Sequence, residues 1–399
     1  MKKVLLINEQ YPLPENSGAH QRTMLFARYF KEHGDVDLVY SQKTGDVQNG
    51  DNIFRNKKYI PRQDVPNSRR DHAVLMLEGF PWCVRARHSK RYKKILFSMI
   101  EKETYDLIFI RYPFNAQYFL KQPVKLREKV IVDFDDMLSG PLYSLVYSIT
   151  TKYFLKKWFD YQLAVHYEKN CCRKLNKILF CSRHDLEKNF YDKYENARIV
   201  PNVVNLAYFT SYNFGDGFSM DNTFLFVGAL DWVANIEGLE WFIKTIYQPF
   251  QKKNKNSKLL VVGKNPKEAV RQLIRDTETA ELYENVPDVR PYYAKSRFVV
   301  VPLLSGSGTR IKILEAALTE RPLISTAVGA EGLSFQEGVD ILLFNDLDSF
   351  TRDIDLLHNK KIYSKISKKA KQKTIKEYSQ QSFNDSFNNV INEFVDAKK

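Results

Sequence analysis

The chain has 399 residues, of which 44% are apolar or aromatic, enough for two or three domains with buried cores. With 27 Phe, 23 Tyr and only 15 Pro and 16 Gly, the composition excludes a disordered or low-complexity chain. The net charge of +14 favours an anionic partner, namely nucleic acid, an anionic lipid or a phosphorylated ligand, without choosing among them.

Cysteine usage and the N-terminus bear on the compartment. No C-x-x-C pair occurs among the four cysteines, Cys83, Cys171, Cys172 and Cys181, so we expect reduced thiols in a cytosolic protein. The N-terminal apolar run VLLI is only four residues long, which indicates a first strand and not a signal peptide. No apolar run approaches the roughly 20 residues that span a bilayer, so any membrane contact is expected to be peripheral.

Short, uninterrupted apolar runs recur along the first half of the chain, as in parallel strands that are covered on both faces. They predict strands at 4–8, 36–40, 106–111, 129–134, 177–182 and 198–202. Helical patterns lie between most of these runs. The first, at 20–34, ends at Gly34, a residue suited to a helix C-cap.

The same alternation restarts after residues 206–221, which lack a helical period. It predicts strands at 223–228, 258–264, 297–304, 321–326 and 340–345, with helices between them and a helical, lysine-rich tail at 360–396. Two such halves predict an α/β chain of two doubly wound, Rossmann-like domains that face each other across a cleft. We expect domains at 1–205 and 206–374, with a C-terminal helix at about 375–399 that packs back on the first.

The segment LLSGSGTRIKILEA (303–316) places a small, glycine-containing loop between a buried strand and a helix. Ligands of doubly wound domains bind beyond the carboxyl ends of the strands, and a helix N-terminus suits an anion. The two glycines lack the Cβ atoms that would hold a phosphate away, and Arg310 and Lys312 add positive charge. An ordinary strand-to-helix turn explains the same residues about as well. The spacing is not that of a Walker A loop.

Residues 301–333, VPLLSGSGTRIKILEAALTERPLISTAVGAEGL, resemble the donor-site signature of retaining GT-B glycosyltransferases of the family 4 type, which use nucleotide-diphosphate sugars. Other segments resemble this family in the same order, at 11–34, 181–186, 200–205, 224–243 and 286–302, so the resemblance covers nearly the whole chain. It implies a GT-B fold with an acceptor-binding first domain and a donor-binding second domain. It implies no cofactor and no metal ion beside the nucleotide-sugar co-substrate.

The resemblance also implies a set of donor-binding residues in the second domain: Gly228, Asn235, Val289, Gly306, Ser307, Gly308, Thr309, Arg310, Lys312 and Glu315. Arg310 and Lys312 would neutralise the diphosphate, Glu315 would bind the ribose, and the loop around Val289 would hold the base through its main chain. The chain departs from the family twice. Ser307 stands where many relatives have a second glutamate, and the segment 229–232 lacks the Arg and Lys that many relatives have there.

The segment VDFDDML (132–138) places Asp133, Asp135 and Asp136 at the end of a buried strand. Carboxylates this close shift each other's pKa, which is common at functional sites. Three interpretations stay open: a D-x-D metal site, as in the other major glycosyltransferase fold, an N-cap cluster for the next helix, or a polar part of the acceptor site. The duplicated β/α halves argue against the first. Asp135, where many relatives have a histidine, is expected to be catalytic or to position the acceptor.

Further acceptor-side residues are expected in the first helix. By the resemblance, Gly18 lets the preceding loop approach the diphosphate, and Arg22 one turn later either faces the cleft or is solvated. With Asp133 and Asp136 they make up the expected acceptor side. None of the seven histidines forms an i, i+4 pair, so neither a metal site nor a catalytic histidine is expected.

Basic runs that include aromatic residues occur at 85–94, 153–174 and 360–376. They suit an anionic membrane surface, although solvated helix faces are the simpler explanation. No helix-turn-helix, zinc or single-strand-binding signature is visible, so nucleic acid is not expected as a partner. We expect a cytoplasmic, retaining transferase, peripheral on the inner membrane face, that acts on a lipid-linked glycan in polysaccharide synthesis. The alternatives are a catalytically silent nucleotide-sugar-binding protein and a basic nucleic-acid-binding protein.

Overall fold

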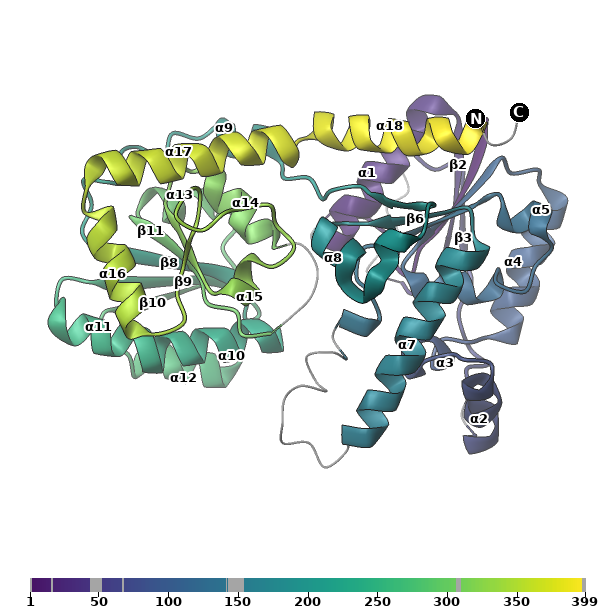
Figure 1. The fold of residues 1–399 in the computed structure, drawn as a ribbon, viewed down its shortest axis with the longest axis horizontal. Coiled ribbons are helices and arrows are strands. Elements are labelled where there is room, and N and C mark those ends of the chain that lie inside the picture. Colours follow the sequence, from purple (N-terminus) through teal and green to yellow (C-terminus); the bar gives the residue numbers. More distant parts are fainter. Residues whose placement is uncertain are drawn as a thin grey trace. The chain divides into compact units, whose positions relative to one another are not determined.

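The computed structural model of the chain describes residues 2–15, 17–43, 52–66, 68–140, 142, 154–305 and 310–396. The chain divides into two compact units (Figure 1). Residues 1–201 and 384–399 form the N-terminal unit, and residues 202–383 form the C-terminal unit. The described strands pair in parallel within each unit, as the uninterrupted apolar runs predict.

The N-terminal unit is built on a seven-stranded sheet in the order β3-β2-β1-β4-β5-β6-β7. Its strands are β1 (Lys3–Ile7), β2 (Asp35–Tyr40), β3 (Asn56–Tyr59), β4 (Leu107–Arg111), β5 (Val130–Phe134), β6 (Lys177–Phe180) and β7 (Ala197–Ile199). The strand order reverses between β1 and β4. In such sheets ligands bind beyond the carboxyl ends of the strands at this point.

Helices cover this sheet, and the last one comes from the far end of the chain. They are α1 (Gly18–His33), α2 (Arg69–Leu77), α3 (Trp82–Arg85), α4 (Lys90–Lys102), η1 (Pro113–Tyr118), α5 (Val124–Arg127), α7 (Phe154–Lys174), α8 (Arg183–Glu187), η2 (Lys188–Lys193) and α18 (Gln380–Asp396). Phe387 of α18 packs with its ring centroid 4.9 Å from that of Phe26 and 6.0 Å from that of Phe109. Among the described helices, none combines the length and the apolar character that crossing a membrane requires.

The C-terminal unit has a six-stranded sheet in the order β10-β9-β8-β11-β12-β13. Its strands are β8 (Thr223–Ala229), β9 (Lys258–Lys264), β10 (Ala280–Glu284), β11 (Phe298–Val301), β12 (Leu323–Ser325) and β13 (Leu342–Leu343). Its helices are α9 (Leu206–Thr210), α10 (Val233–Trp241), η3 (Phe242–Tyr247), α11 (Gln248–Lys253), α12 (Glu268–Arg275), α13 (Arg290–Ala294), α14 (Ile311–Leu318), α15 (Ala327–Ala330), α16 (Leu347–Leu357) and α17 (Lys360–Glu377). One apolar cluster includes Phe242 and Phe350, and a second includes Tyr293 and Ile313.

The expected α/β fold with two doubly wound domains is confirmed, and the differences lie at the margins. β3 and β10 were not predicted. They are edge strands with the polar sequences NKKY and AELYE, and a strand with one neighbour needs no continuous apolar run. Residues 206–210, expected to be irregular, form α9, because the Asn205 side chain accepts a hydrogen bond from the Tyr208 N–H at 3.0 Å.

Candidate functional site

Four of the expected donor-binding residues come from the carboxyl edge of the C-terminal sheet. Gly228 is the last residue but one of β8, and Asn235 lies in the first turn of α10, which follows it. Lys312 and Glu315 lie three residues apart on α14, which follows β11. Because these strands are parallel neighbours, the helices after them begin at the same edge of the sheet.

A hydrogen-bonded chain joins two of these residues, Lys312 and Asn235, to the main chain at the end of β8. The Lys312 Nζ donates to Asn235 Oδ1 at 2.7 Å, and Asn235 Nδ2 donates to the Ala229 carbonyl at 2.8 Å. The second bond fixes which end of the amide faces the lysine. A Cβ atom at Gly228 would lie 3.0 Å from Asn235 Nδ2 and 3.2 Å from Lys312 Nζ. Glycine therefore leaves the room in which the amide and the ammonium group meet.

The charged groups on α14 have perturbed pKa values. Burial, with a smaller contribution from the nearby Arg310 guanidinium, lowers the pKa of Lys312 to about 8. Burial raises the pKa of Glu315 to about 7, against the opposing effect of Lys312. Arg310 is buried at the N-cap position of α14. Groups that titrate this near neutrality in a partly buried cluster are typical of ligand sites.

These pKa values predict a pH dependence for any reaction that is catalysed at this cluster. Lys312 is an ammonium ion below about pH 8 and Glu315 a carboxylate above about pH 7, so kcat/KM should be highest between these values. Glu315→Gln should remove the acid limb. It should also move the basic limb to lower pH, because the Glu315 carboxylate raises the pKa of Lys312. A profile of kcat/KM for both proteins checks this, and an unchanged acid limb in the variant would contradict it.

A polar cluster fixes the segment around Val289. Asp288 accepts hydrogen bonds from Arg290 Nη2 at 2.8 Å and from the Tyr208 hydroxyl at 2.6 Å, and the Arg290 guanidinium lies 4.0 Å from the centroid of the Tyr208 ring. The Val289 carbonyl accepts from the N–H groups of Tyr292 and Tyr293, so it belongs to the first turn of α13. The buried Tyr293 hydroxyl has no hydrogen-bond partner among the described residues.

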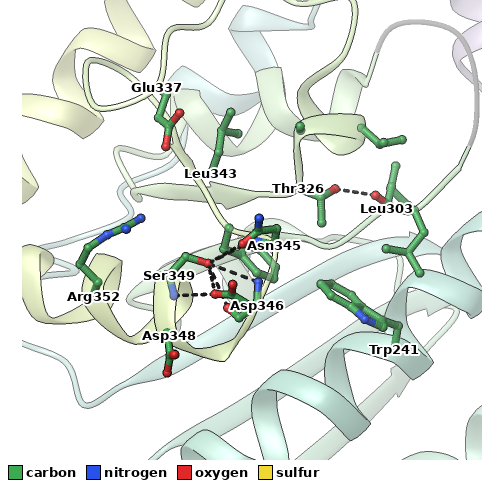
Figure 2. Close-up of a pocket in the computed structure, with 14 residues that line it drawn as sticks. Trp241, Leu303, Thr326, Glu337, Leu343, Asn345, Asp346, Asp348, Ser349 and Arg352 are labelled. Carbon is green, nitrogen blue, oxygen red and sulfur yellow. Dashed lines mark hydrogen bonds between the residues drawn. The ribbon is translucent and has the colours of Figure 1, made fainter.

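The other four expected donor-binding residues, Gly306, Ser307, Gly308 and Thr309, lie outside the described residues. The chain that leads into this loop is held in place: the Thr326 hydroxyl donates to the Leu303 carbonyl at 2.5 Å, a bond drawn in Figure 2. Thr326 follows β12, so the neighbouring strand fixes the start of the loop.

A pocket of about 770 Å³ lies at the carboxyl ends of β11, β12 and β13. Figure 2 shows Trp241, Thr326, Asn345 and Asp346 around it. Asp346 caps α16 by accepting a hydrogen bond from the Ser349 N–H at 2.8 Å, so this carboxylate is already engaged. The pocket adjoins Leu303 and Leu304, which precede residues 306–309 in the chain, whereas Lys312 follows these residues and lies on α14.

In the N-terminal unit, two buried arginines surround the carboxylate of Asp133 at the end of β5. Arg22 on α1 makes a bidentate pair with it, with Nε to Oδ2 at 2.9 Å and Nη2 to Oδ1 at 2.7 Å. Arg111, the last residue of β4, also donates to Asp133 Oδ2. Arg22 Nη2 and Nη1 donate to the carbonyls of Val200 and Pro201 as well. The cluster therefore joins α1, β4, β5 and the segment after β7.

Asp135 lies at the open side of this cluster, with 13% of its side chain exposed. Its Oδ2 accepts from Arg111 Nη2 at 2.7 Å, and Cys181 Sγ lies 3.4 Å from its Oδ1. Burial opposes the ionisation of Asp135, but the charges of Arg111 and Arg22 outweigh it and lower the pKa of this carboxyl. Asp135 is therefore a weak base but a good acceptor of hydrogen bonds.

The structure bears on the open interpretations of the aspartates. Both oxygens of Asp133 are engaged by guanidinium groups. The N–H groups of Leu138 and Ser139, which follow the aspartates, donate to Glu168 of α7. Asp136 is exposed, as is Gly18, the first residue of α1. Within the described ranges, no three His, Cys, Asp or Glu side chains are grouped as metal ligands would be.

Sequence reasoning missed a second polar cluster at the carboxyl edge of the N-terminal sheet. Glu9, after β1, pairs with Arg62 Nη2 at 2.9 Å and lies 3.6 Å from Arg87 Nε. It also accepts from Ser41 and Gln42, which follow β2. Arg111 was missed too. The available signal was positional, since Glu9, Arg62 and Arg111 are charged residues at or just beyond the carboxyl ends of strands.

The chain is similar in sequence to a known protein family and to a protein of another organism. Residues 221–360 match the family model described as glycosyl transferases group 1. A protein of Klebsiella pneumoniae, described as an uncharacterized 44.6 kDa protein in the cps region, is 23% identical over 370 residues. The match covers 89% of this chain and 90% of that protein.

Solved structures share the fold at low sequence identity. Sucrose-phosphate synthase from Thermosynechococcus elongatus has a TM-score of 0.70 with 14% identity over 100% of both chains. HepE of Anabaena in complex with UDP has a TM-score of 0.69 with 12% identity over 98% of this chain and 100% of that one. WaaG, described as a glycosyltransferase involved in lipopolysaccharide biosynthesis, has a TM-score of 0.64 with 14% identity, and the match covers 96% of this chain and 99% of that one. The group 1 match lies in the C-terminal unit, and the whole chain shares the fold of GT-B glycosyltransferase structures; together these findings support a GT-B glycosyltransferase.

Proposed function

We propose that this transferase is a retaining enzyme of the family 4 type. It moves a sugar from a nucleotide diphosphate to a lipid-linked glycan in cell-surface polysaccharide synthesis. The observation that carries the proposal is the partly buried Lys312, held by Asn235 beside Gly228 at the start of α14. The names of the relatives support the pathway: one is assigned to a cps region, WaaG to lipopolysaccharide biosynthesis, and HepE has been solved with UDP and with UDP-glucose.

In the proposed mechanism the donor diphosphate lies against the N-terminus of α14. The acceptor hydroxyl attacks the anomeric carbon, the bond from that carbon to the diphosphate oxygen breaks, and the leaving oxygen takes the electron pair. Lys312 and Arg310 stabilise the charge that develops on the leaving group, and Glu315 accepts hydrogen bonds from the ribose. The acceptor oxygen attacks on the face of the sugar from which the diphosphate leaves, which retains the configuration, and the proton of the acceptor hydroxyl passes to a phosphate oxygen of the leaving group.

Asp135 is proposed to accept a hydrogen bond from the acceptor hydroxyl, and Arg111 and Arg22 hold the Asp135 carboxylate in position. Because these arginines lower its pKa, Asp135 stays ionised and orients the nucleophile without removing its proton in advance. Asp133 then has a structural task, which is to pair with both guanidinium groups and hold them together.

The anomeric configuration of the product tests the chemistry. Proton NMR of the sugar released or transferred at early times should show the configuration of the donor. An inverted product would reject the retaining mechanism but leave the transferase identity intact. Donor binding without any turnover, with or without lipid-linked acceptors, would favour the catalytically silent alternative, which the missing cations of segment 229–232 suggest.

Activity is expected to survive removal of divalent metal ions. The proposal assigns the diphosphate charge to Arg310, Lys312 and a helix N-terminus, so no cation is needed there. Turnover should change less than twofold, on the order of experimental error, after treatment with EDTA. Full loss with EDTA and rescue by Mn²⁺ would contradict this expectation.

The proposed acceptor is lipid-linked, so the N-terminal unit should contact the cytoplasmic face of the membrane. Apolar side chains are exposed on two neighbouring helices: Leu77 of α2 is 85% exposed, and Leu155 and Trp158 of α7 are 77% and 45% exposed. α3 connects the helices. Arg85 Nη1 donates to the His72 carbonyl of α2, and the Trp82 N–H donates to Asp160 of α7. Figure 1 shows α2, α3 and α7 close together.

The structure also changes which basic residues belong to this surface. The run 85–94 was expected to be exposed, but Arg85 is buried and Arg87 lies beside Glu9. Lys156, beside Leu155 on α7, is exposed. The proposed membrane surface is therefore defined by Leu77, Trp82, Leu155, Lys156, Trp158 and Phe159.

Replacing Leu155, Trp158 and Phe159 by Ser should weaken binding to vesicles with anionic lipid by about tenfold or more. Each side chain contributes roughly 1.5–3 kcal/mol when fully buried, and half-exposed ones contribute less. Cosedimentation at low salt measures the effect. Val124→Ser with Phe190→Ser is a matched control, because these side chains are 56% and 63% exposed elsewhere in the same unit. Equal loss in the control, or no vesicle binding by the wild-type protein, would contradict the proposed surface.

A further inference from the structure

A second pocket, of about 590 Å³, lies at the amino-terminal edge of the C-terminal sheet. Its lining includes Asn222 before β8, Ser257 before β9 and Arg297 before β11, together with the segment 252–256 and His358 after α16. The donor residues Gly228 and Lys312 lie at the carboxyl ends of the same strands. The two sites therefore occupy opposite edges of one sheet.

The charge around this pocket is strongly positive. Lys252, Lys253 and Lys255 are exposed at its rim, Arg297 lies inside, and the acidic lining residue is Asp221. Lys252 and Lys253 lie in the last turn of α11, where cations also complement the helix dipole. That explanation does not extend to Arg297, which lies at the start of a strand.

Arg297 is a buried cation without an anionic partner. Arg297 is 8% exposed, and no described carboxylate lies within ion-pair distance of its guanidinium group. Nη1 donates to the Met220 carbonyl at 3.1 Å and lies 3.5 Å from Asn222 Oδ1, while the buried Nε has no hydrogen-bond partner. A buried guanidinium that is not neutralised is costly, so a site that retains one is suited to an anion.

A hydroxyl group that lines the same pocket also lacks a hydrogen-bond partner. Ser257 is 1% exposed, and its Oγ has no hydrogen-bond partner in the described part of the chain. Arg321, a buried arginine of the same unit, provides the contrast. Its Nε and Nη2 donate to the carbonyls of Ser296 and Phe214 at 2.7 and 2.5 Å, which is how a purely structural arginine is satisfied.

We propose that this pocket is a second anion site, separate from the donor site, which takes the phosphate or diphosphate group of a phosphorylated ligand. Phosphate oxygens would accept from Arg297 and Ser257 inside the pocket, and the lysines would neutralise the remaining charge at the rim. The phosphate group can belong to a soluble metabolite or to a phospholipid headgroup. The inference does not depend on the proposed transferase mechanism.

Isothermal titration with pyrophosphate tests the proposal on the full chain. The background is Lys312→Ala, which removes the donor-site lysine and so lowers the contribution of the donor site to the measured binding. Pyrophosphate should bind this variant, and adding Lys252→Gln, Lys253→Gln and Lys255→Gln should weaken binding by about tenfold or more. The matched control adds Lys365→Gln, Lys368→Gln and Lys369→Gln, three exposed lysines of α17, and should leave binding unchanged. Equal affinity in both triple variants, or no binding to the background, would overturn the proposal.

Further measurements protect the test against a misfolded variant and distinguish a soluble phosphorylated ligand from a phospholipid headgroup. Arg297→Gln should also lose pyrophosphate binding, and if it fails to fold, the lysine variant decides. The pKa of His358 is lowered by burial and by the charge of Arg297 and raised by Asp355, and in an NMR titration pyrophosphate should raise this pKa.

The source of the phosphate group is tested separately. Binding of glucose 1-phosphate without vesicles identifies a soluble ligand, and phosphate-competed binding to phosphatidic acid vesicles identifies a headgroup. Failure of both would overturn the assignment to a phosphorylated ligand.

Discussion

Lys312→Ala is expected to lower kcat/KM for sugar transfer by about 10²–10³-fold, which corresponds to roughly 2.7–4 kcal/mol of transition-state stabilisation. The ammonium group is partly buried, oriented by Asn235 and close to Arg310, so it meets the developing charge of the leaving group with little reorganisation. Donor binding should weaken, because Lys312 is proposed to contact the diphosphate already in the ground state, and kcat should fall as well, because the charge on the leaving group grows in the transition state.

The control for this prediction is Lys365→Ala, which removes an exposed lysine of α17 in the same unit. Its kinetics should equal those of the wild-type protein. Asn235→Ala should reproduce part of the Lys312 effect, because it frees the ammonium group without removing it. Wild-type kcat/KM in Lys312→Ala would reject the assignment of the diphosphate to α14.

The second large effect is on stability. Asp133→Asn should lower the free energy of unfolding by about 3–5 kcal/mol, because it leaves the two buried guanidinium charges of Arg22 and Arg111 with Asp135 as their one remaining counter-charge. Asparagine keeps the shape of the side chain, so the loss reports charge and not packing. Urea unfolding, followed by circular dichroism, measures the change.

Asp192→Asn is the matched control, because Asp192 is an exposed carboxylate in the same unit. Its free energy of unfolding should stay within about 0.5 kcal/mol of wild type. If Asp133→Asn were equally neutral, the two-arginine cluster could not be what joins α1, β4 and β5. Asp135→Asn should be milder, because Asp135 is partly exposed and Asp133 still neutralises one guanidinium.

Much of the fold could be predicted because buried parallel strands have a direct sequence signal. FVVV of β11 is an uninterrupted apolar run, and VIVDF of β5 is apolar except for Asp133, because both strands are buried on both faces of their sheets. β3 and β10 have no such requirement at the sheet edges, so their polar sequences gave no signal. The short helix α9 depends on a single cap residue, which is a weaker signal than a periodic pattern.

The candidate site was predictable only in part. The residue types around Lys312 and Glu315 could be read from one contiguous segment that resembles a known family. The contact of Lys312 with Asn235, 77 residues away, depends on the tertiary fold. The same holds for Arg22 and Asp133, which are separated by 111 residues. The basic run 85–94 was expected to be exposed, but its composition alone does not predict that Arg85 is buried against His72 and Asp160, which are distant in the sequence.

A thermal-shift screen against UDP-, GDP-, ADP- and CMP-sugars tests the central claim most directly. A donor that binds the native state at about 100 times its Kd adds roughly 2.7 kcal/mol of stability. We predict that at least one nucleotide sugar raises the unfolding temperature of the wild-type protein, and that Lys312→Ala loses most of this shift while Lys365→Ala keeps it. If no nucleotide sugar in the panel changes the unfolding temperature, or if the shift survives unchanged in Lys312→Ala, the donor site described for α14 is contradicted.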